Sequence, residues 1–238
     1  MEWNLQELSA LVESRFGTEQ KEQVVPLLNT VDKKFKIARY HEAEFNRLEE
    51  QYFNGNEGEN YIKAIDYVFG IVTKDDSVQS FVNACFIAEA NLIAYSHSIH
   101  SIFDILGQIT IESLNIRKLF KPTQNIYLHT VKEKLKTENI APDVVWAIEE
   151  ALNDSSCNYL KAFVNINKHL NILYMPHTVL MKPENEQFYG LRIDQFSYKG
   201  ETYQSKWGKK FVTQESDKIF EQHVKIGNSL NETLRKMI

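Results

Sequence analysis

The segment 162–169 (AFVNINKH) carries a carboxamide and an imidazole at a spacing of one helical turn. If the segment is helical, Asn165 and His169 lie on one face, and Asn158 lies on that face two turns earlier. A histidine partly shielded from water titrates near neutral pH and can move protons. The same side chains can instead serve as structural polar groups that satisfy each other and a loop carbonyl, so both interpretations stay open. The shielding is expected from an adjacent apolar stripe of Tyr159, Phe163, Ile166, Leu170 and Leu173.

A second polar set interrupts the segment 77–114, which is otherwise apolar on nearly every side of a helix. His97, His100 and Asp104 follow spacings of three and four residues, which place them on one helical face. Buried polar side chains need partners, because an unpaired one costs about 1–3 kcal/mol. The set is a polar seam if its partner is another helix or a second subunit. It is a metal or ligand site if His169 adds a fourth ligand, since first-row metals accept such nitrogen and oxygen sets.

The composition limits the classes of protein that fit this chain. Its 238 residues, 43% of them hydrophobic, suffice for one domain with a sizeable core. The formal net charge of −5 argues against a protein that coats nucleic acid non-specifically, although a local basic patch is compatible with this charge. Nine Gly and five Pro favour helices over a turn-rich β fold. Cys85 and Cys157 form neither a disulfide framework nor a zinc motif, which favours a reducing, cytoplasmic compartment.

Several familiar sequence signals are missing. The first residues lack the basic and apolar regions of a signal peptide, and no apolar run reaches the length that spans a bilayer. The chain has no Gly-rich phosphate loop and no Gly-x-Ser-x-Gly nucleophile motif. We therefore expect no membrane association and no cofactor.

Hydrophobic periodicity predicts an all-α, antiparallel helical bundle that forms a single domain over residues 1–238. Short connections favour antiparallel neighbours in such a bundle. Its expected parts are a bundle core over residues 30–175, a small β-hairpin insert over 177–214 and a C-terminal helix over 215–238.

Turn residues divide the expected helices. A break is expected at 54–60 and a turn at 74–77, where Asp76 or Ser77 caps the next helix. Pro176 is expected to end the helix that carries Asn165 and His169. The helices are expected over 4–15, 29–53, 61–73, 77–114, 124–136, 143–174 and 215–238.

The expected hairpin, with its turn at residues 199–201, mixes aromatic and basic side chains. Basic groups between aromatic rings can neutralise and stack on single-stranded RNA. The alternative is that the aromatic face only packs the hairpin on the bundle. The residues concerned are Arg192, Phe196, Tyr198, Lys199, Tyr203, Lys206, Trp207, Lys209 and Lys210.

Two blocks of the sequence resemble the HEPN superfamily. The block 158–169 (NYLKAFVNINKH) is similar to the signature of the third and fourth helices of HEPN-like bundles. It is most similar to a bacterial branch with a Phe-Val-Asn-x-x-Lys-His pattern, which residues 163–169 match. The block 96–106 (SHSIHSIFDIL) is similar to the long second helix of the same branch. The resemblance covers roughly residues 30–175.

The resemblance implies a four- or five-helix, HEPN-like bundle that is usually a homodimer. Many members are metal-independent ribonucleases of toxin, antiviral or RNA-processing systems, and others bind nucleotides or act as scaffolds. Active members carry an Arg, a polar residue and a His. The His corresponds to His169 and the polar residue to Asn165 or Asn167. The Arg has no counterpart here, and the nearby cations are Lys161 and Lys168, which lack its planar fork.

Three functional hypotheses follow. The first is a ribonuclease or RNA-binding protein of a bacterial defence or toxin system, in which His169 is the acid or base and Asn165 orients it. Lys168 or Lys161 would neutralise the phosphorane. The second is a catalytically inactive interaction module, and the third is a metal-binding hydrolase. The expected partners are a second copy of the chain, RNA and a neighbouring gene's product. Binding roles are expected for Asn158, Lys161, His97, His100 and Asp104.

Overall fold

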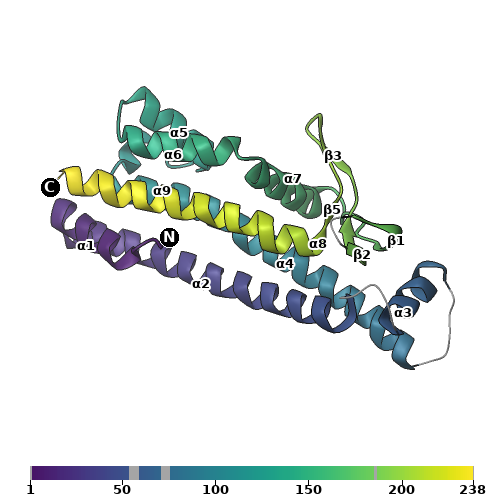
Figure 1. The fold of residues 1–238 in the computed structure, drawn as a ribbon. Helices are drawn as coiled ribbons and strands as arrows, with labels where there is room; N and C mark the ends of the chain where they lie inside the picture. The colour runs from purple at the N-terminus through teal and green to yellow at the C-terminus, as the bar shows by residue number, and fades with distance from the viewer. Residues whose placement is uncertain (1, 54–58, 71–75, 185–186, 238) are drawn as a thin grey trace. The chain divides into compact units, whose positions relative to one another are not determined.

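The computed structural model describes residues 2–53, 59–70, 76–184 and 187–237. The chain is mostly helical, with a small antiparallel sheet in its C-terminal part (Figure 1). This confirms the expected helical fold with β structure before the last helix. The α-helices are α1 (Leu5–Phe16), α2 (Thr18–Leu48), α3 (Glu59–Val68), α4 (Asp76–Ser113), α5 (Leu128–Thr137), α6 (Pro142–Asn153), α7 (Ser155–His169), α8 (Gly208–Lys210) and α9 (Ser216–Met237).

Several helix boundaries differ from the expected ones. Helix α2 begins at Thr18 rather than Asn29, because it runs through Pro26 instead of starting after it. It continues into a π-helical segment at Glu49–Phe53, and a second π-helical segment, Phe211–Glu215, precedes α9. The expected break at 54–60 and turn at 74–77 lie mostly outside the described residues. Within them, residues 59–60 and 76–77 already belong to helices.

The single helix expected over 143–174 is wrong, since the structure has two helices there. Helix α6 ends at Asn153 and α7 begins at Ser155. The Asp154 carboxylate separates them by accepting hydrogen bonds from the backbone N–H groups of Ser156 and Cys157, both at 2.9 Å. A side-chain acceptor that caps free N–H groups fixes a helix start at this point.

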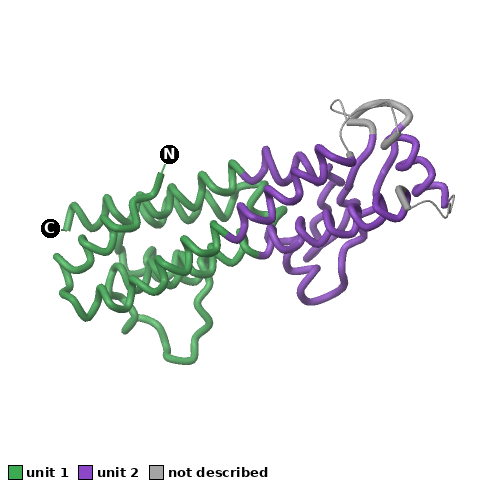
Figure 2. The backbone as a smooth tube through the Cα atoms, turned by 90° about the horizontal axis from the view of Figure 1, so that it is seen from below, with its two compact units in different colours: residues 1–36, 98–160, 217–238 green, residues 37–97, 161–216 purple. Residues whose placement is uncertain are grey.

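The chain forms two compact units, each assembled from segments that are distant in sequence (Figure 2). Unit 1 comprises residues 1–36, 98–160 and 217–238, and unit 2 comprises residues 37–97 and 161–216. Fully buried core residues of unit 1 include Leu8, Val12, Val31, Ile102, Leu106, Ile109, Val144, Ile148, Ile226 and Leu230. The core of unit 2 includes Phe45, Phe81, Leu92, Phe163, Ile166, Tyr189, Leu191 and Phe211.

The β structure belongs to unit 2 and consists of two strand groups instead of the one expected hairpin. A three-stranded antiparallel sheet has the order β1-β2-β5, and β3 pairs with β4. The β3–β4 turn falls at Lys199 and Gly200, as expected, with φ values of +52° and +87°. Positive φ at both positions is typical of two-residue hairpin turns. The strands are β1 (His177–Glu184), β2 (Gln187–Ile193), β3 (Phe196–Tyr198), β4 (Glu201–Tyr203) and β5 (Lys206–Trp207).

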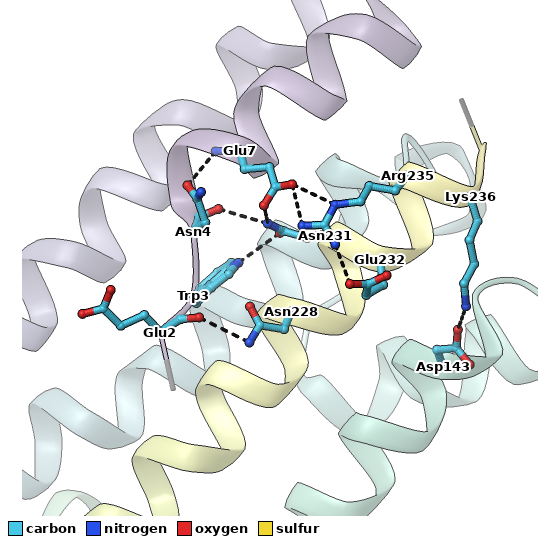
Figure 3. Close-up of polar contacts among 10 residues, drawn as sticks. All are labelled: Glu2, Trp3, Asn4, Glu7, Asp143, Asn228, Asn231, Glu232, Arg235 and Lys236. Carbon is cyan, nitrogen blue, oxygen red and sulfur yellow. Dashed lines mark hydrogen bonds and ion pairs between the residues drawn. The ribbon is translucent and has the colours of Figure 1, made fainter.

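The N-terminal segment of unit 1 is fastened to α9 by side-chain hydrogen bonds (Figure 3). Trp3 Nε1 donates to Asn231 Oδ1 at 3.2 Å. The Asn231 amide in turn donates to the Asn4 carbonyl and to Glu7 Oε2, both at 3.1 Å. Asn231 is only 2% exposed, so these bonds satisfy a buried amide. The Trp3 ring lies so close to α9 that only a glycine fits beneath it, at Gly227.

Gly227→Ala is expected to lower the free energy of unfolding by about 1–3 kcal/mol, the usual cost of overpacking. A Cβ atom at this position would lie 2.2 Å from Trp3 Cδ2. In a Trp3→Ala background the same change should be neutral or stabilise by up to about 1 kcal/mol, since alanine favours a helix over glycine. Urea unfolding of all four proteins in this cycle measures the coupling. An equal loss in both backgrounds would contradict the role assigned to Trp3.

Candidate functional site

Helix α7 buries one side of its C-terminal half and exposes the other. Phe163 and Ile166 are buried, as the expected apolar stripe required. Leu170 is not part of that stripe, because its side chain is 71% exposed. The physical reason is that α7 ends at His169, so the helical periodicity does not reach Leu170 or Leu173. The imidazole therefore stands at the last position of the helix instead of in its middle.

The opposite side of α7 gathers Lys161, Asn165, Lys168 and His169. Lys161, Lys168 and His169 are exposed, and Asn165 is partly exposed. At about 100° of rotation per residue, these four positions fall within one sector of about 100° around the helix. We call these four residues the α7 polar face. It combines two ammonium groups, an amide and an imidazole, all accessible to a solute.

The amide of Asn165 is engaged within its own helix. Its Nδ2 donates to the Lys161 carbonyl oxygen at 2.7 Å. Within the part of the chain that the structure describes, no hydrogen bond joins Asn165 to His169. The orienting role assigned to Asn165 therefore stays a prediction.

Of the two other asparagines expected at the site, Asn167 has a structural role. Asn167 lies on a different side of the helix from the α7 polar face, donates to the Phe163 carbonyl at 2.9 Å and accepts the Leu173 N–H at 3.0 Å. The bond from Leu173 holds the chain that leaves α7, which explains the asparagine without a reaction. Asn158 is half-buried in unit 1, and its backbone N–H donates to the Asp154 carbonyl at 3.0 Å.

The polar set of α4 is partly buried, with His97 and His100 half-buried and Asp104 exposed. His97 belongs to unit 2, whereas His100 and Asp104 belong to unit 1. Across the described residues, no three His, Cys, Asp or Glu side chains are grouped closely enough to hold a metal ion. The set does not form the ligand cluster that the metal hypothesis requires.

Unit 2 also contains a buried carboxyl group that sequence reasoning missed. Glu49, the first residue of a π-helical segment, is 1% exposed, and its Oε1 has no hydrogen-bond partner among the described residues. Burial raises the pKa of Glu49 to about 8, against a smaller lowering by the charge of Lys209. The carboxyl group is thus largely protonated at neutral pH. π-Helical segments are frequent at functional sites, which makes Glu49 notable.

A cysteine and a histidine meet in the same unit. Cys85 Sγ of α4 lies 3.6 Å from Nδ1 of His177 of β1. Burial raises the pKa of Cys85 to about 12 and lowers the pKa of His177 to about 3. The pair is therefore a neutral thiol and a neutral imidazole instead of a thiolate and an imidazolium. A buried thiol of this kind is a poor nucleophile, so the geometry supports packing over catalysis.

A second neutral imidazole lies in unit 1. His223 of α9 is fully buried, with its ring centroid 4.1 Å from that of Phe103 and 5.8 Å from that of Phe35. Burial, with a smaller contribution from the charge of His100, lowers the pKa of His223 to about 3. In the described part of the chain, neither ring nitrogen has a hydrogen-bond partner.

These buried groups carry no local sequence signal. Glu49 is followed by Glu50 in a charged stretch, and a charged stretch indicates a solvated helix face. Cys85 and His177 are 92 residues apart in the sequence. Only the tertiary fold brings them together, so no spacing rule could have found them.

Comparisons with models of protein families, with curated proteins and with solved structures gave no match. None of the described helices has the length and apolar character that crossing a membrane requires.

Glu49 predicts how stability changes with pH. Its pKa is about 8 in the folded chain, against a reference value of 4.5, so the folded state keeps a proton that the unfolded state releases. The stability contributed by this protonated carboxyl is therefore lost as pH rises from 4.5 to 8. Glu49→Gln should remove this loss, whereas Glu50→Gln, at the exposed neighbour, should follow the wild type. Denaturant unfolding at intervals between pH 5 and 9 tests this, and parallel curves for wild type and Glu49→Gln would contradict it.

The buried imidazoles act in the opposite direction. His177 and His223 have pKa values of about 3 in the folded chain, against 6.5 as the reference value. The unfolded chain takes up their protons below pH 6.5 while the folded chain does not, so stability falls as pH falls from 6.5 towards 3. His223→Phe should flatten this acid limb, and replacement of the exposed His129 by Phe should leave it unchanged.

Proposed function

We propose that this chain is a metal-independent ribonuclease or RNA-binding protein that uses the α7 polar face. One observation carries the proposal: Lys161, Asn165, Lys168 and His169 share an accessible sector of a helix whose opposite side is buried. Ammonium groups bind phosphate oxygens, and an exposed imidazole can exchange protons with a substrate. The resemblance of residues 158–169 to the HEPN motif gives the same assignment independently of the exposure. A role in a bacterial defence or toxin system rests on that resemblance.

The proposed chemistry uses the groups of the face in distinct roles. His169 takes the proton of a ribose 2′-hydroxyl or gives one to the leaving 5′-oxygen. Lys168, together with Lys161, offsets the negative charge that builds up on the non-bridging phosphate oxygens during attack. Attack by the 2′-oxygen forms a bond to phosphorus as the bond to the 5′-oxygen breaks, which leaves a 2′,3′-cyclic phosphate. A single chain offers one imidazole here, and a second copy would add the other proton carrier.

If the protein cleaves RNA in this way, His169→Ala should lower the cleavage rate by about 10²- to 10⁴-fold, the usual contribution of a general acid or base. Because His169 is exposed, the substitution should leave the melting temperature unchanged. Lys168→Ala should weaken cleavage less. The matched control is His129→Ala, which removes an exposed histidine from α5.

The assay uses end-labelled single-stranded and hairpin RNAs in excess chelator, with detection of cyclic phosphate ends. Binding is measured separately by fluorescence anisotropy, in which Lys161→Ala should weaken binding more than Lys118→Ala, an exposed lysine elsewhere. Binding without cleavage would restrict the proposal to RNA recognition. Absence of both would overturn it in favour of the catalytically inactive interaction module.

A second candidate function, as an interaction module, is favoured by the apolar residues that follow the α7 polar face. Leu170, Ile172 and Tyr174 are 71%, 66% and 73% exposed. Large apolar side chains that are exposed together within five residues are typical of a protein interface. We propose that this segment contributes to a homodimer, which would set two α7 polar faces in one assembly.

Dimerisation through this segment predicts that a Leu170→Glu, Ile172→Glu double variant is monomeric at concentrations where the wild type is dimeric. Burying two carboxylates in an apolar interface is unfavourable unless they are paired. Tyr40→Glu is the control, because Tyr40 is also an exposed apolar residue, at 62%. Sedimentation velocity at micromolar concentration gives the answer, and a wild-type species of 27.8 kDa alone would count against the dimer.

A further inference from the structure

We propose that a pocket between α6 and α9 in unit 1 binds a primary ammonium group at the end of an alkyl chain. The pocket has a volume of about 520 Å³. Its size suits a small ligand or a single long side chain. The pocket shares no residue with the α7 polar face. The lining residues are Trp146, Glu149, Glu150, Asn153, Asp154 and Gln222.

The pocket already contacts an ammonium group of the chain itself. Lys225 Nζ lies 4.1 Å from the centroid of the Trp146 ring and donates to Glu150 Oε2 at 2.5 Å. An aromatic face next to a carboxylate is the combination that attracts organic cations. Trp146 is 59% exposed despite this contact, so much of the indole remains accessible to a second cation. Lys225 thus shows the chemistry that the pocket favours and also competes for it.

Two further groups supply acceptors. Glu149 is only weakly engaged, since its Oε1 lies 3.8 Å from Lys132 Nζ. The side-chain oxygen of Gln222 is shielded from solvent and has no hydrogen-bond partner among the described residues. A shielded acceptor without a donor is unfavourable, so a ligand that donates hydrogen bonds would relieve this cost. A primary ammonium has three N–H donors, whereas a quaternary ammonium has none.

The charge of the pocket excludes anions. Glu149, Glu150 and Asp154 contribute carboxylates, and the Asp154 Oδ1 atom is occupied in capping α7. Lys225 offsets one of the remaining charges. The pocket therefore favours a cation that can reach Glu149 and the Trp146 ring together. Lysine side chains and free diamines share this chemistry.

The test is a titration of the full chain followed through the indole N–H signals in ¹⁵N–¹H correlation spectra. The chain has three tryptophans, and a Trp146→Phe variant assigns the relevant signal. n-Butylammonium should shift the Trp146 signal with saturation and leave those of Trp3 and Trp207 in place. 1-Butanol, which has the same shape without the charge, should not shift it. Equal shifts with the alcohol, or shifts without saturation, would overturn the proposal.

Three variants test which side chains determine the dissociation constant of n-butylammonium. Glu149→Gln should raise the dissociation constant at least fivefold, and Lys225→Met should lower it severalfold because the internal competitor is removed. Glu19→Gln makes the same charge change at an exposed residue of α2, and it should leave the constant unchanged. Equal constants in all variants would overturn the proposal, and so would weaker binding to Lys225→Met.

Comparison of a blocked lysine amide with 1,5-diaminopentane then distinguishes a peptide side chain from a free amine. Either preference supports the pocket, and failure of both to bind overturns it.

Discussion

Helix α4 is apolar on most of its circumference, so other segments of the chain cover much of its length, although Phe86 and Ile87 stay 71% and 43% exposed. The driving force is the removal of apolar surface from water. This effect has no preferred direction, so any segment that packs closely on the helix is stabilised by it. In unit 1, α9 provides His223 against Phe103 of α4. In unit 2, β1 provides His177 against Phe81 and Cys85. The small sheet and the terminal helix are thus part of the cover that this one helix demands.

The same constraint explains the unusual protonation states. Covering segments bring a few polar side chains with them, and burial disfavours their charged forms. His177 and His223 are held neutral, and Glu49 keeps its proton at neutral pH. These three side chains are buried, and burial accounts for their pKa values without a catalytic role. A shifted pKa alone is therefore a poor indicator of function in this chain.

Accessibility identifies the two surfaces to which we assign binding. The α7 polar face is cationic and faces solvent at the end of its helix, which suits phosphate. The α6–α9 pocket is acidic and aromatic, which suits an ammonium group. Because their charges are opposite, a ligand of one is not expected to bind the other. Failure of RNA to bind the α7 polar face would therefore leave the ammonium site of the α6–α9 pocket unaffected, and the reverse also holds.

The sequence by itself determined features that depend on neighbours along the chain. Helical periodicity predicted α4 and the buried side of α7, and Lys199-Gly200 predicted a turn, because these patterns act within a few residues. The sequence could not show that Asp154 would divide one apolar stretch into two helices. The apolar periodicity continues across the position of this cap, so it gives no sign of the break. Only the tertiary structure decided that Glu49 is buried and that Trp146 borders a pocket. Burial depends on which distant segments pack together, and that choice is made by the whole chain.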